Sequence, residues 1–277
     1  MKLTIENFFL RTVFGEDEAL RMIKEAGFDG VDYSFHGEKG KALDFGDHIG
    51  MAKKTKALLD KYGLSCSQGH APFELSFGDE LNETNENYLN IVKTLEFASI
   101  IGCENVVVHA IKVPAGEDFL TLNLKYYKSL IPYAEKFGVK IAVENLLNSI
   151  FWMPEKLNKF IEMLNSPVFV SCIDVGHSAI VGLPAENFIS GMNKNLIACV
   201  HLHDTDNKKD RHWIPFQGEH NWDNILKALA DYGFAGDMNL EVIHSFDALP
   251  SELYSAMLEY IAKVGRYMIE RFNEFKS

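Results

Sequence analysis

The stretch VFVSCIDVGHSAIVGLP, residues 168–184, shows how this chain is built: an apolar run of strand-forming residues stops at a carboxylate and an imidazole. A second stretch, IACVHLHDTDNKKDRHWIPFQGEHNW at 197–222, repeats the pattern, and its apolar run ends at His201, His203 and Asp204. Burying unpaired polar side chains at the end of a core strand is costly, whereas these side chains are common ligands of divalent metals. The pattern therefore predicts strands that carry a metal site at their carboxyl ends.

Short β-rich runs alternate with helical patterns along the chain. Apolar residues between the runs recur with the 3.6-residue period of amphipathic helices, and glycine follows several helix ends, where a left-handed C-cap is favoured. The predicted strands are 2–7, 30–35, 64–71, 105–110, 140–145, 168–174, 197–204 and 237–243. The predicted helices are 16–26, 49–62, 83–101, 118–137, 154–164, 185–193, 223–232 and 252–272.

Eight strands that alternate with eight helices predict an α/β fold, a (β/α)8 TIM barrel that forms a single domain over residues 1–277. Such barrels take about 250 residues, and no repeat, linker or low-complexity segment divides this chain. A doubly wound open sheet is the alternative fold. It has less support, because no GxGxxG motif for dinucleotide binding follows a predicted strand.

The composition limits the class of protein. Hydrophobic residues make up 47% of the chain, yet no run of about 18 apolar residues could span a membrane. The N-terminal MKLTIENFFLRTVFGEDE lacks the features of a signal peptide, and the four cysteines form no CxxC pair and are expected to be reduced. The net charge of -12 disfavours nucleic acid as a partner, because phosphate binding usually needs a basic face. We expect a cytoplasmic protein.

Six successive predicted strands, from the third to the eighth, end at potential metal ligands. Neighbouring ligands are spaced by 27 to 40 residues, about one strand–helix unit, and the carboxyl ends of barrel strands meet at one mouth. One such histidine or glutamate alone would be explained by a hydrogen bond or a salt bridge, but six strands in phase favour a shared site. The residues are His70, His109, Glu144, Asp174 with His177, His201 with His203, and Glu241.

The residue types narrow the choice of metal. Glu144, Asp174, His201 and Glu241 are suited to hold one divalent ion and to leave positions open for a substrate. This oxygen-rich set favours Mn, Mg or Co, and additional histidines shift the preference toward Zn. Further candidates for metal or substrate binding are His70, His109, His177, His203, Asp210, His212, Arg211, Trp152 and Trp213. Aromatic and basic loop residues that could contact a sugar or its phosphate are Phe8, Phe9, Phe73, Phe216, Trp222, Lys112, Lys208 and Lys209.

An ordered set of motifs gives the chain a family resemblance. The motifs are GHAP (69–72), VEN (143–145), CIDVGH (172–177), HLHD (201–204), DRH (210–212) and GEHNW (218–222). In these motifs the chain resembles, over essentially its whole length, the xylose isomerase-like TIM barrel superfamily. That superfamily joins sugar and sugar phosphate isomerases and epimerases with endonuclease IV, of AP endonuclease family 2. The resemblance is specific to the superfamily and much less specific to one activity.

The resemblance implies roles for individual residues. By similarity to ketose 3-epimerases, Glu144, Asp174, His201 and Glu241 match the metal ligands, and His177 matches a histidine that contacts substrate. By similarity to endonuclease IV, all nine ligands of a three-metal site have counterparts here, namely His70, His109, Glu144, Asp174, His177, His201, Asp210, His212 and Glu241. One departure concerns the epimerases, which often place an arginine soon after the seventh-strand histidine, where this loop offers only Lys208, Lys209 and Arg211.

The leading hypothesis is a divalent-metal-dependent isomerase or epimerase of a sugar or sugar phosphate. Glu144 and Glu241 would be the catalytic pair, one removing and one returning a proton, through a metal-stabilised cis-enediolate. The alternatives are an endonuclease IV-like phosphodiesterase on abasic DNA, an inosose dehydratase-like lyase, and a degenerate barrel that only binds. A homo-oligomer is possible, with the C-terminal helix and its Phe272 and Phe275 as one contributor.

Overall fold

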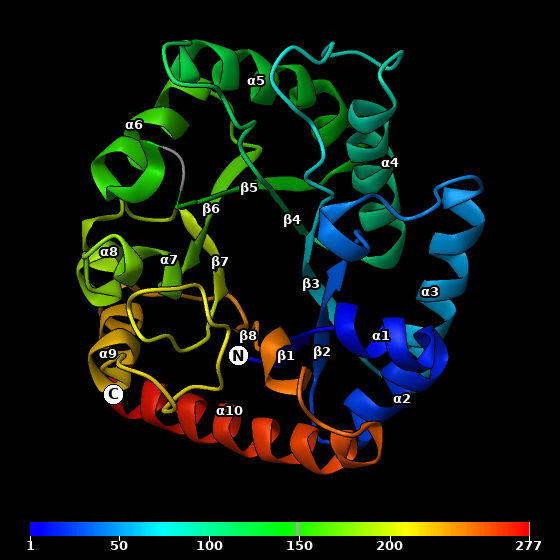
Figure 1. The fold of residues 1–277 in the computed structure, drawn as a ribbon, viewed down its shortest axis with the longest axis vertical. Helices are drawn as coiled ribbons and strands as arrows, with labels where there is room; N and C mark the ends of the chain where they lie inside the picture. Colours follow the sequence, from blue (N-terminus) through cyan, green and yellow to red (C-terminus); the bar gives the residue numbers. More distant parts are fainter. Residues whose placement is uncertain (148–149, 277) are drawn as a thin grey trace.

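Eight parallel strands form a nearly closed barrel at the centre of the computed structural model, which describes residues 1–147 and 150–276 (Figure 1). From β1 to β7 each strand pairs with the next strand in sequence, and β1 also pairs with β8, the last strand. An isolated bridge between Leu202 and Leu240 brings β7 to β8. The strands are β1 (Leu3–Glu6), β2 (Gly30–Ser34), β3 (Ser65–His70), β4 (Asn105–Val108), β5 (Lys140–Glu144), β6 (Phe169–Asp174), β7 (Ile197–His201) and β8 (Met238–Leu240). The predicted barrel is confirmed.

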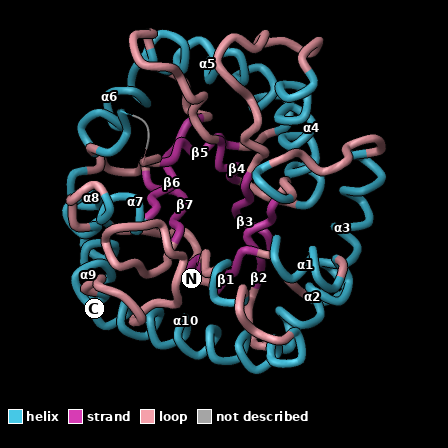
Figure 2. Tube along the Cα trace, in the orientation of Figure 1, coloured by secondary structure: helices cyan, strands magenta, loops and turns pink. Residues whose placement is uncertain are grey.

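Helices enclose the barrel on its outside (Figure 2). The principal helices are α2 (Glu16–Glu25), α3 (His48–Tyr62), α4 (Glu86–Ile101), α5 (Phe119–Phe137), α6 (Pro154–Leu164), α8 (Ala185–Gly191), α9 (Trp222–Tyr232) and α10 (Tyr254–Lys276). These are the eight predicted helices, with ends shifted by up to four residues. The expected C-caps are also present, because Gly63, Gly102, Gly138 and Gly233 are all left-handed.

Two short helices at the mouth of the barrel were not predicted. The seven residues of α1 (Phe8–Phe14) begin with an apolar FFL and have no side-chain N-cap, so the sequence carries little helix signal. The six residues of α7 (Val175–Ile180) follow β6 directly. Four 3-10 turns complete the described elements, namely η1 (Glu38–Gly40), η2 (Ile150–Trp152), η3 (Ile243–Phe246) and η4 (Ser251–Leu253).

Strands β4, β7 and β8 are shorter than predicted at their carboxyl ends, where the backbone leaves the ladder. Strand β8 stops at Leu240 because the next amide, of Glu241, donates to Leu202 and the chain then turns into η3. The potential ligands in this region therefore lie on the first residues past the strands as well as on the strands themselves. This arrangement lets side chains of different strands reach one point in the mouth.

The core has an inner and an outer part. A small cluster of Val107, Ala142, Val170, Cys172 and Cys199 fills the barrel interior below the mouth, and a larger cluster packs strands against helices. Because side chains alternate along a strand, the inner positions of β5, β6 and β7 continue from Ala142, Cys172 and Cys199 to the polar residues of the mouth. All four cysteines are buried and free.

Helix α10 packs its apolar face on the barrel. Phe272 is 1% exposed within the core, so it is not available for the subunit interface suggested from the sequence. Phe275 is partly buried and also packs against this core. Within the described residues, no helix is long and apolar enough to cross a membrane.

Candidate metal centre

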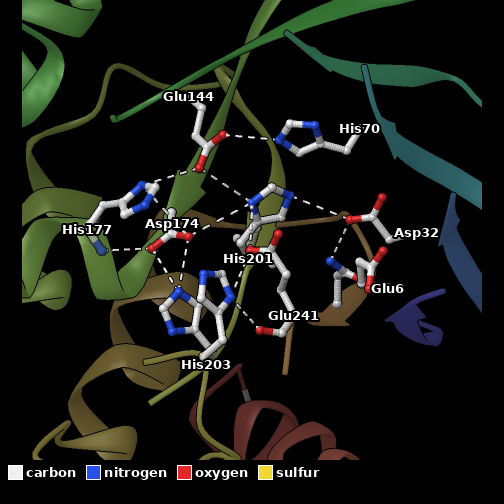
Figure 3. Close-up of polar contacts among 12 residues, drawn as sticks. Glu6, Asp32, His70, Glu144, Asp174, His177, His201, His203 and Glu241 are labelled. Carbon is white, nitrogen blue, oxygen red and sulfur yellow. Dashed lines mark hydrogen bonds and ion pairs between the residues drawn. The ribbon is translucent and has the colours of Figure 1, made fainter. Parts of the chain in front are cut away.

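Side chains from neighbouring strands meet at the carboxyl end of the barrel, around the His201 imidazole (Figure 3). Its Nδ1 lies 3.2 Å from an oxygen of Glu241, 3.6 Å from one of Glu144 and 4.0 Å from one of Asp174. His201, Glu144 and Asp174 are buried, and the Glu241 side chain is 14% exposed. The four residues expected to hold one metal are therefore brought together around one point.

The start of α7 explains the spacing between Asp174 and His177. Asp174 ends β6 and is the N-cap of α7, where its carboxylate accepts a hydrogen bond of 2.8 Å from the backbone N–H of His177. This capping turn places the histidine beside the carboxylate that precedes it. Asn145 fixes the same strand end from β5, because its side chain accepts from the N–H of Asp174 and donates to its carbonyl.

Three further histidines surround Glu144. His109 Nε2 lies 2.8 Å from one of its oxygens, and His177 Nδ1 lies 3.3 Å from the other. His70 Nε2 is 3.7 Å from Glu144 and 2.9 Å from His109 Nε2. Possible ligand atoms of His70, His109 and Glu144 therefore form a second group beside the first. These three residues are among the nine counterparts that the resemblance to endonuclease IV implies.

Asp204 holds the loop at 205–221, which supplies two more candidates, Asp210 and His212. The buried Asp204 carboxylate accepts hydrogen bonds from the backbone N–H groups of Thr205, Phe216 and His220 and from the indole of Trp222. The GEHNW motif is explained by these bonds. Asp204 is thus a structural residue at the base of the loop, not one of the grouped ligands.

Asp210 and His212 lie next to His177 and His203. Asp210 is 3.4 Å from His177 Nε2 and 3.1 Å from His212 Nε2, and the ring of His212 stacks on His203 at 4.1 Å. His203 in turn lies 3.1 Å from Asp174. His212 has a left-handed backbone with φ of 45°, which is uncommon for a residue other than glycine and marks a locally constrained loop.

Burial and charge compete throughout this site. Burial would lower the pKa of His201, but nearby carboxylates, Glu241 above all, raise it well above its usual value. Burial would likewise raise the pKa of Glu144, but His109 and the other histidines hold it well below its usual range. For His109 burial prevails and lowers its pKa to about 4. The Glu144 carboxylate is therefore ionised in the site.

The donor set fits a divalent metal. His201 Nδ1 and His177 Nδ1 make no hydrogen bond although carboxylate oxygens lie within 4 Å of each, and Asp210 Oδ1 is also buried without a hydrogen bond. Buried polar atoms without a partner are rare and call for an explanation. Here several such atoms and ionised carboxylates face one shared point. A cation bound at that point would give these atoms a partner.

A cavity of about 190 Å³ opens beside the cluster. His109 and His177 form its side toward the cluster, and the side chains of Phe73, Ile111 and Phe119 line the rest together with other apolar groups. Lys112 is the lysine in its wall. Phe73 also stacks on His109 with ring centres 4.7 Å apart. A ligand that reaches the cluster therefore has apolar surface next to it.

Other candidates from the sequence have partners outside the cluster. Arg211 makes an ion pair with Asp206 at 2.7 Å, and its guanidinium lies over the ring of Trp213. Trp152 is 40% exposed and lies under the ammonium of Lys156. The structure does not place these side chains among the grouped ligands or in the wall of the cavity.

Two buried carboxylates that the sequence reasoning passed over lie below the cluster, on β1 and β2. Asp32 is 3.5 Å from His201 Nε2, and Glu6 accepts a hydrogen bond from Ser34. Burial, opposed only in part by hydrogen bonds, raises the pKa of Glu6 to about 7. The signal was the one used for the other strands, a carboxylate within an apolar run, and after Asp32 the same run ends at a histidine, His36.

Comparisons with known proteins agree with this fold. A family model described as "Xylose isomerase-like TIM barrel" matches residues 20–264. An uncharacterized protein of Methanocaldococcus jannaschii is 27% identical over 241 residues, which cover 82% of this chain and 81% of that protein. Fructoselysine 3-epimerase of Escherichia coli O157:H7 is 21% identical over 243 residues, 82% of this chain and 85% of the enzyme. The crystal structure of a D-tagatose 3-epimerase-like protein has the same fold, with a TM-score of 0.78 at 22% identity over 99% of both chains. Since the family match spans most of its length, this chain belongs to the xylose isomerase-like TIM barrel family.

Proposed function

We propose that this protein is a divalent-metal-dependent isomerase or epimerase of a sugar or a sugar derivative. The observation that carries the proposal is the position of Glu144 and Glu241, whose carboxylates flank His201 Nδ1 at 3.6 and 3.2 Å beside an open cavity. A pair of carboxylates around one reacting position can exchange a proton on two faces of a substrate. The family members named as 3-epimerases add support at the level of the fold.

The residues would divide the reaction between them. A divalent metal held by Glu144, Asp174, His201 and Glu241 would polarise the sugar carbonyl and stabilise the negative charge that develops on its oxygen. One of the two glutamates would take the proton from the carbon next to the carbonyl. The other would deliver a proton to the opposite face, which gives an epimer, or to the neighbouring carbon, which gives an isomer. His177, between Glu144 and the cavity, would contact a substrate hydroxyl.

Proton exchange with solvent tests this proposal. We would load the protein with Mn²⁺, Co²⁺ or Mg²⁺, incubate it in D₂O with a panel of ketoses and ketose phosphates, and follow deuterium incorporation by NMR. Glu144→Gln and Glu241→Gln should each lower the exchange rate by several orders of magnitude, because neither amide can accept the proton. Glu135→Gln, an exposed change on α5, is the matched control and should leave exchange unaltered. Exchange near the normal rate in either site variant would show the assignment to be wrong.

A second candidate function is metal-dependent hydrolysis of a phosphodiester, as in the endonuclease IV branch of the superfamily. The grouping of His70 and His109 with Glu144, and the approach of Asp210 to His177 and His212, favour a site for more than one cation. Metal content measured by elemental mass spectrometry separates the two functions. About three zinc ions per chain with cleavage of abasic DNA would support the hydrolase, and one manganese, cobalt or magnesium would support the epimerase.

A further inference from the structure

Asp32 is a buried carboxylate directly beneath the candidate metal centre. It lies on β2, is 1% exposed, and its Oδ2 accepts hydrogen bonds of 2.8 Å from the amide of Gln68 on β3 and of 2.9 Å from the amide of Asn239 on β8. Its Oδ1 is buried without a hydrogen bond. The two neutral amides hold the carboxylate in place without cancelling its charge, and keeping such a charge buried is costly unless it acts on a partner.

The partner that it faces is His201. Its Nε2 lies 3.5 Å from Asp32 Oδ2, while Nδ1, on the other edge of the ring, points to the cluster carboxylates, with Glu241 at 3.2 Å (Figure 3). Among the described residues Nε2 makes no hydrogen bond, and the Asp32 carboxylate is the acidic group that it faces. A neutral imidazole has one N–H and one lone pair. With the N–H directed at Asp32, the lone pair is on Nδ1, where a metal would be bound.

We propose that Asp32 is a positioning residue that fixes the Nε2–H tautomer and the orientation of His201 and so strengthens metal binding. This inference rests on the metal site of the proposed function. A carboxylate that accepts the second N–H of a ligating histidine makes the ring a better donor, and the loss of such a partner typically weakens metal binding 10–100-fold. Asp32 acts through His201 and does not contact the substrate.

Asp32→Asn is the direct test, because asparagine can keep one oxygen facing both amides while it removes the charge and replaces the other oxygen by an NH2 group. We would measure the affinity of the purified apo-protein for Co²⁺ by competition with a chromophoric chelator. Asp32→Asn should bind Co²⁺ about 10–100-fold more weakly than the unsubstituted protein. An affinity within about threefold of the unsubstituted protein would overturn the proposal.

Thr4→Val is the matched control. Thr4 is fully buried and donates a hydrogen bond of 3.0 Å to Asn239, so it belongs to the same polar network but reaches Asp32 only through Asn239. The variant should lower the melting temperature and leave the Co²⁺ affinity within about threefold. A loss of affinity equal to that of Asp32→Asn would mean that general damage to the network, and not the charge of Asp32, explains the result.

A second test reads the protonation of His201 in the unsubstituted protein, and His201→Gln serves only to assign its signals. In ¹⁵N-histidine NMR spectra of the Zn²⁺-loaded protein, the ring signals absent from His201→Gln should report a protonated Nε2 and a metal-bound Nδ1. Metal on Nε2, or a proton on Nδ1, would overturn the proposal. Neither experiment measures turnover, so the two proposals can fail separately. If the unsubstituted protein exchanges no sugar proton but Asp32→Asn binds Co²⁺ more weakly, the proposed function is refuted and this inference stands.

Discussion

Asp204→Ala should destabilise the protein strongly, because it removes a buried carboxylate that accepts four hydrogen bonds from the loop at 205–221 and from Trp222. The Asp204 carboxylate accepts from three backbone N–H groups and from the indole of Trp222, at 2.8 to 3.2 Å. A buried donor left without an acceptor costs about 1–3 kcal/mol. Even at the lower limit, four donors give about 4 kcal/mol, a large share of the roughly 5–15 kcal/mol by which domains are stable.

The loss is measurable by thermal and urea denaturation followed by circular dichroism. A decrease of about 4 kcal/mol in the free energy of unfolding corresponds to roughly 8–16 °C in melting temperature for a chain of this size. Trp222→Phe removes only the indole donor and should cost about 1–2 kcal/mol. Limited proteolysis should cut Asp204→Ala within the loop sooner than the unsubstituted protein, because the loop has lost its hydrogen bonds to the Asp204 carboxylate.

Asp206→Ala is the matched control from the same loop. Asp206 is partly exposed and pairs with Arg211 near the surface, and such pairs contribute about 0–1 kcal/mol. A free energy of unfolding for Asp204→Ala within about 1 kcal/mol of that for Asp206→Ala would refute the reasoning. It would mean that water or a rearranged loop replaces the buried carboxylate at little cost.

Three further predictions concern the surroundings of the site. The pKa of Glu6 is raised to about 7, so the folded state keeps a proton that the unfolded state releases above about pH 4.5. The free energy of unfolding should therefore decrease by about 3 kcal/mol as the pH rises from about 4.5 to 7. Glu6→Gln should abolish that loss. Urea titrations of both proteins at pH 5 and pH 8 give the free energy of unfolding at each pH, and the same change between the two pH values in both proteins would show the idea to be wrong. Gly176→Ala should displace the His203 ring, because an added Cβ would lie 2.1 Å from its Cε1; the melting temperature should fall by several degrees, and an unchanged value would contradict the tight contact. Lys112→Gln should raise the KM of a phosphorylated substrate about tenfold and leave that of a neutral ketose unaltered, and equal effects on both would exclude a role for its charge in the cavity wall.

Much of this molecule is determined locally by its sequence. The alternation of apolar β-rich runs with amphipathic helical segments, and the glycines that end the helices, predict the barrel because both signals act over a few residues. The spacing of Asp174 and His177 is of the same kind, since an N-cap and the residue three positions later meet in any helix start. The regular interval between the ligands then follows from the strand–helix repeat.

Only the tertiary structure decided which polar side chains do what. Asp204 and Asp174 end equivalent apolar runs, yet one holds a loop and the other joins the cluster. The carboxylate of Asp204 is surrounded by the loop that follows it, whereas that of Asp174 faces His201 of the neighbouring strand. Asp32 looks like an isolated carboxylate until barrel closure brings β2 opposite His201 of β7. Arg211 and Trp213, close to the ligands in sequence, are drawn away by contacts with Asp206 and with each other. Metal binding and proton transfer depend on distances between strands that are far apart along the chain, and those distances are set by packing and barrel closure, not by local preference.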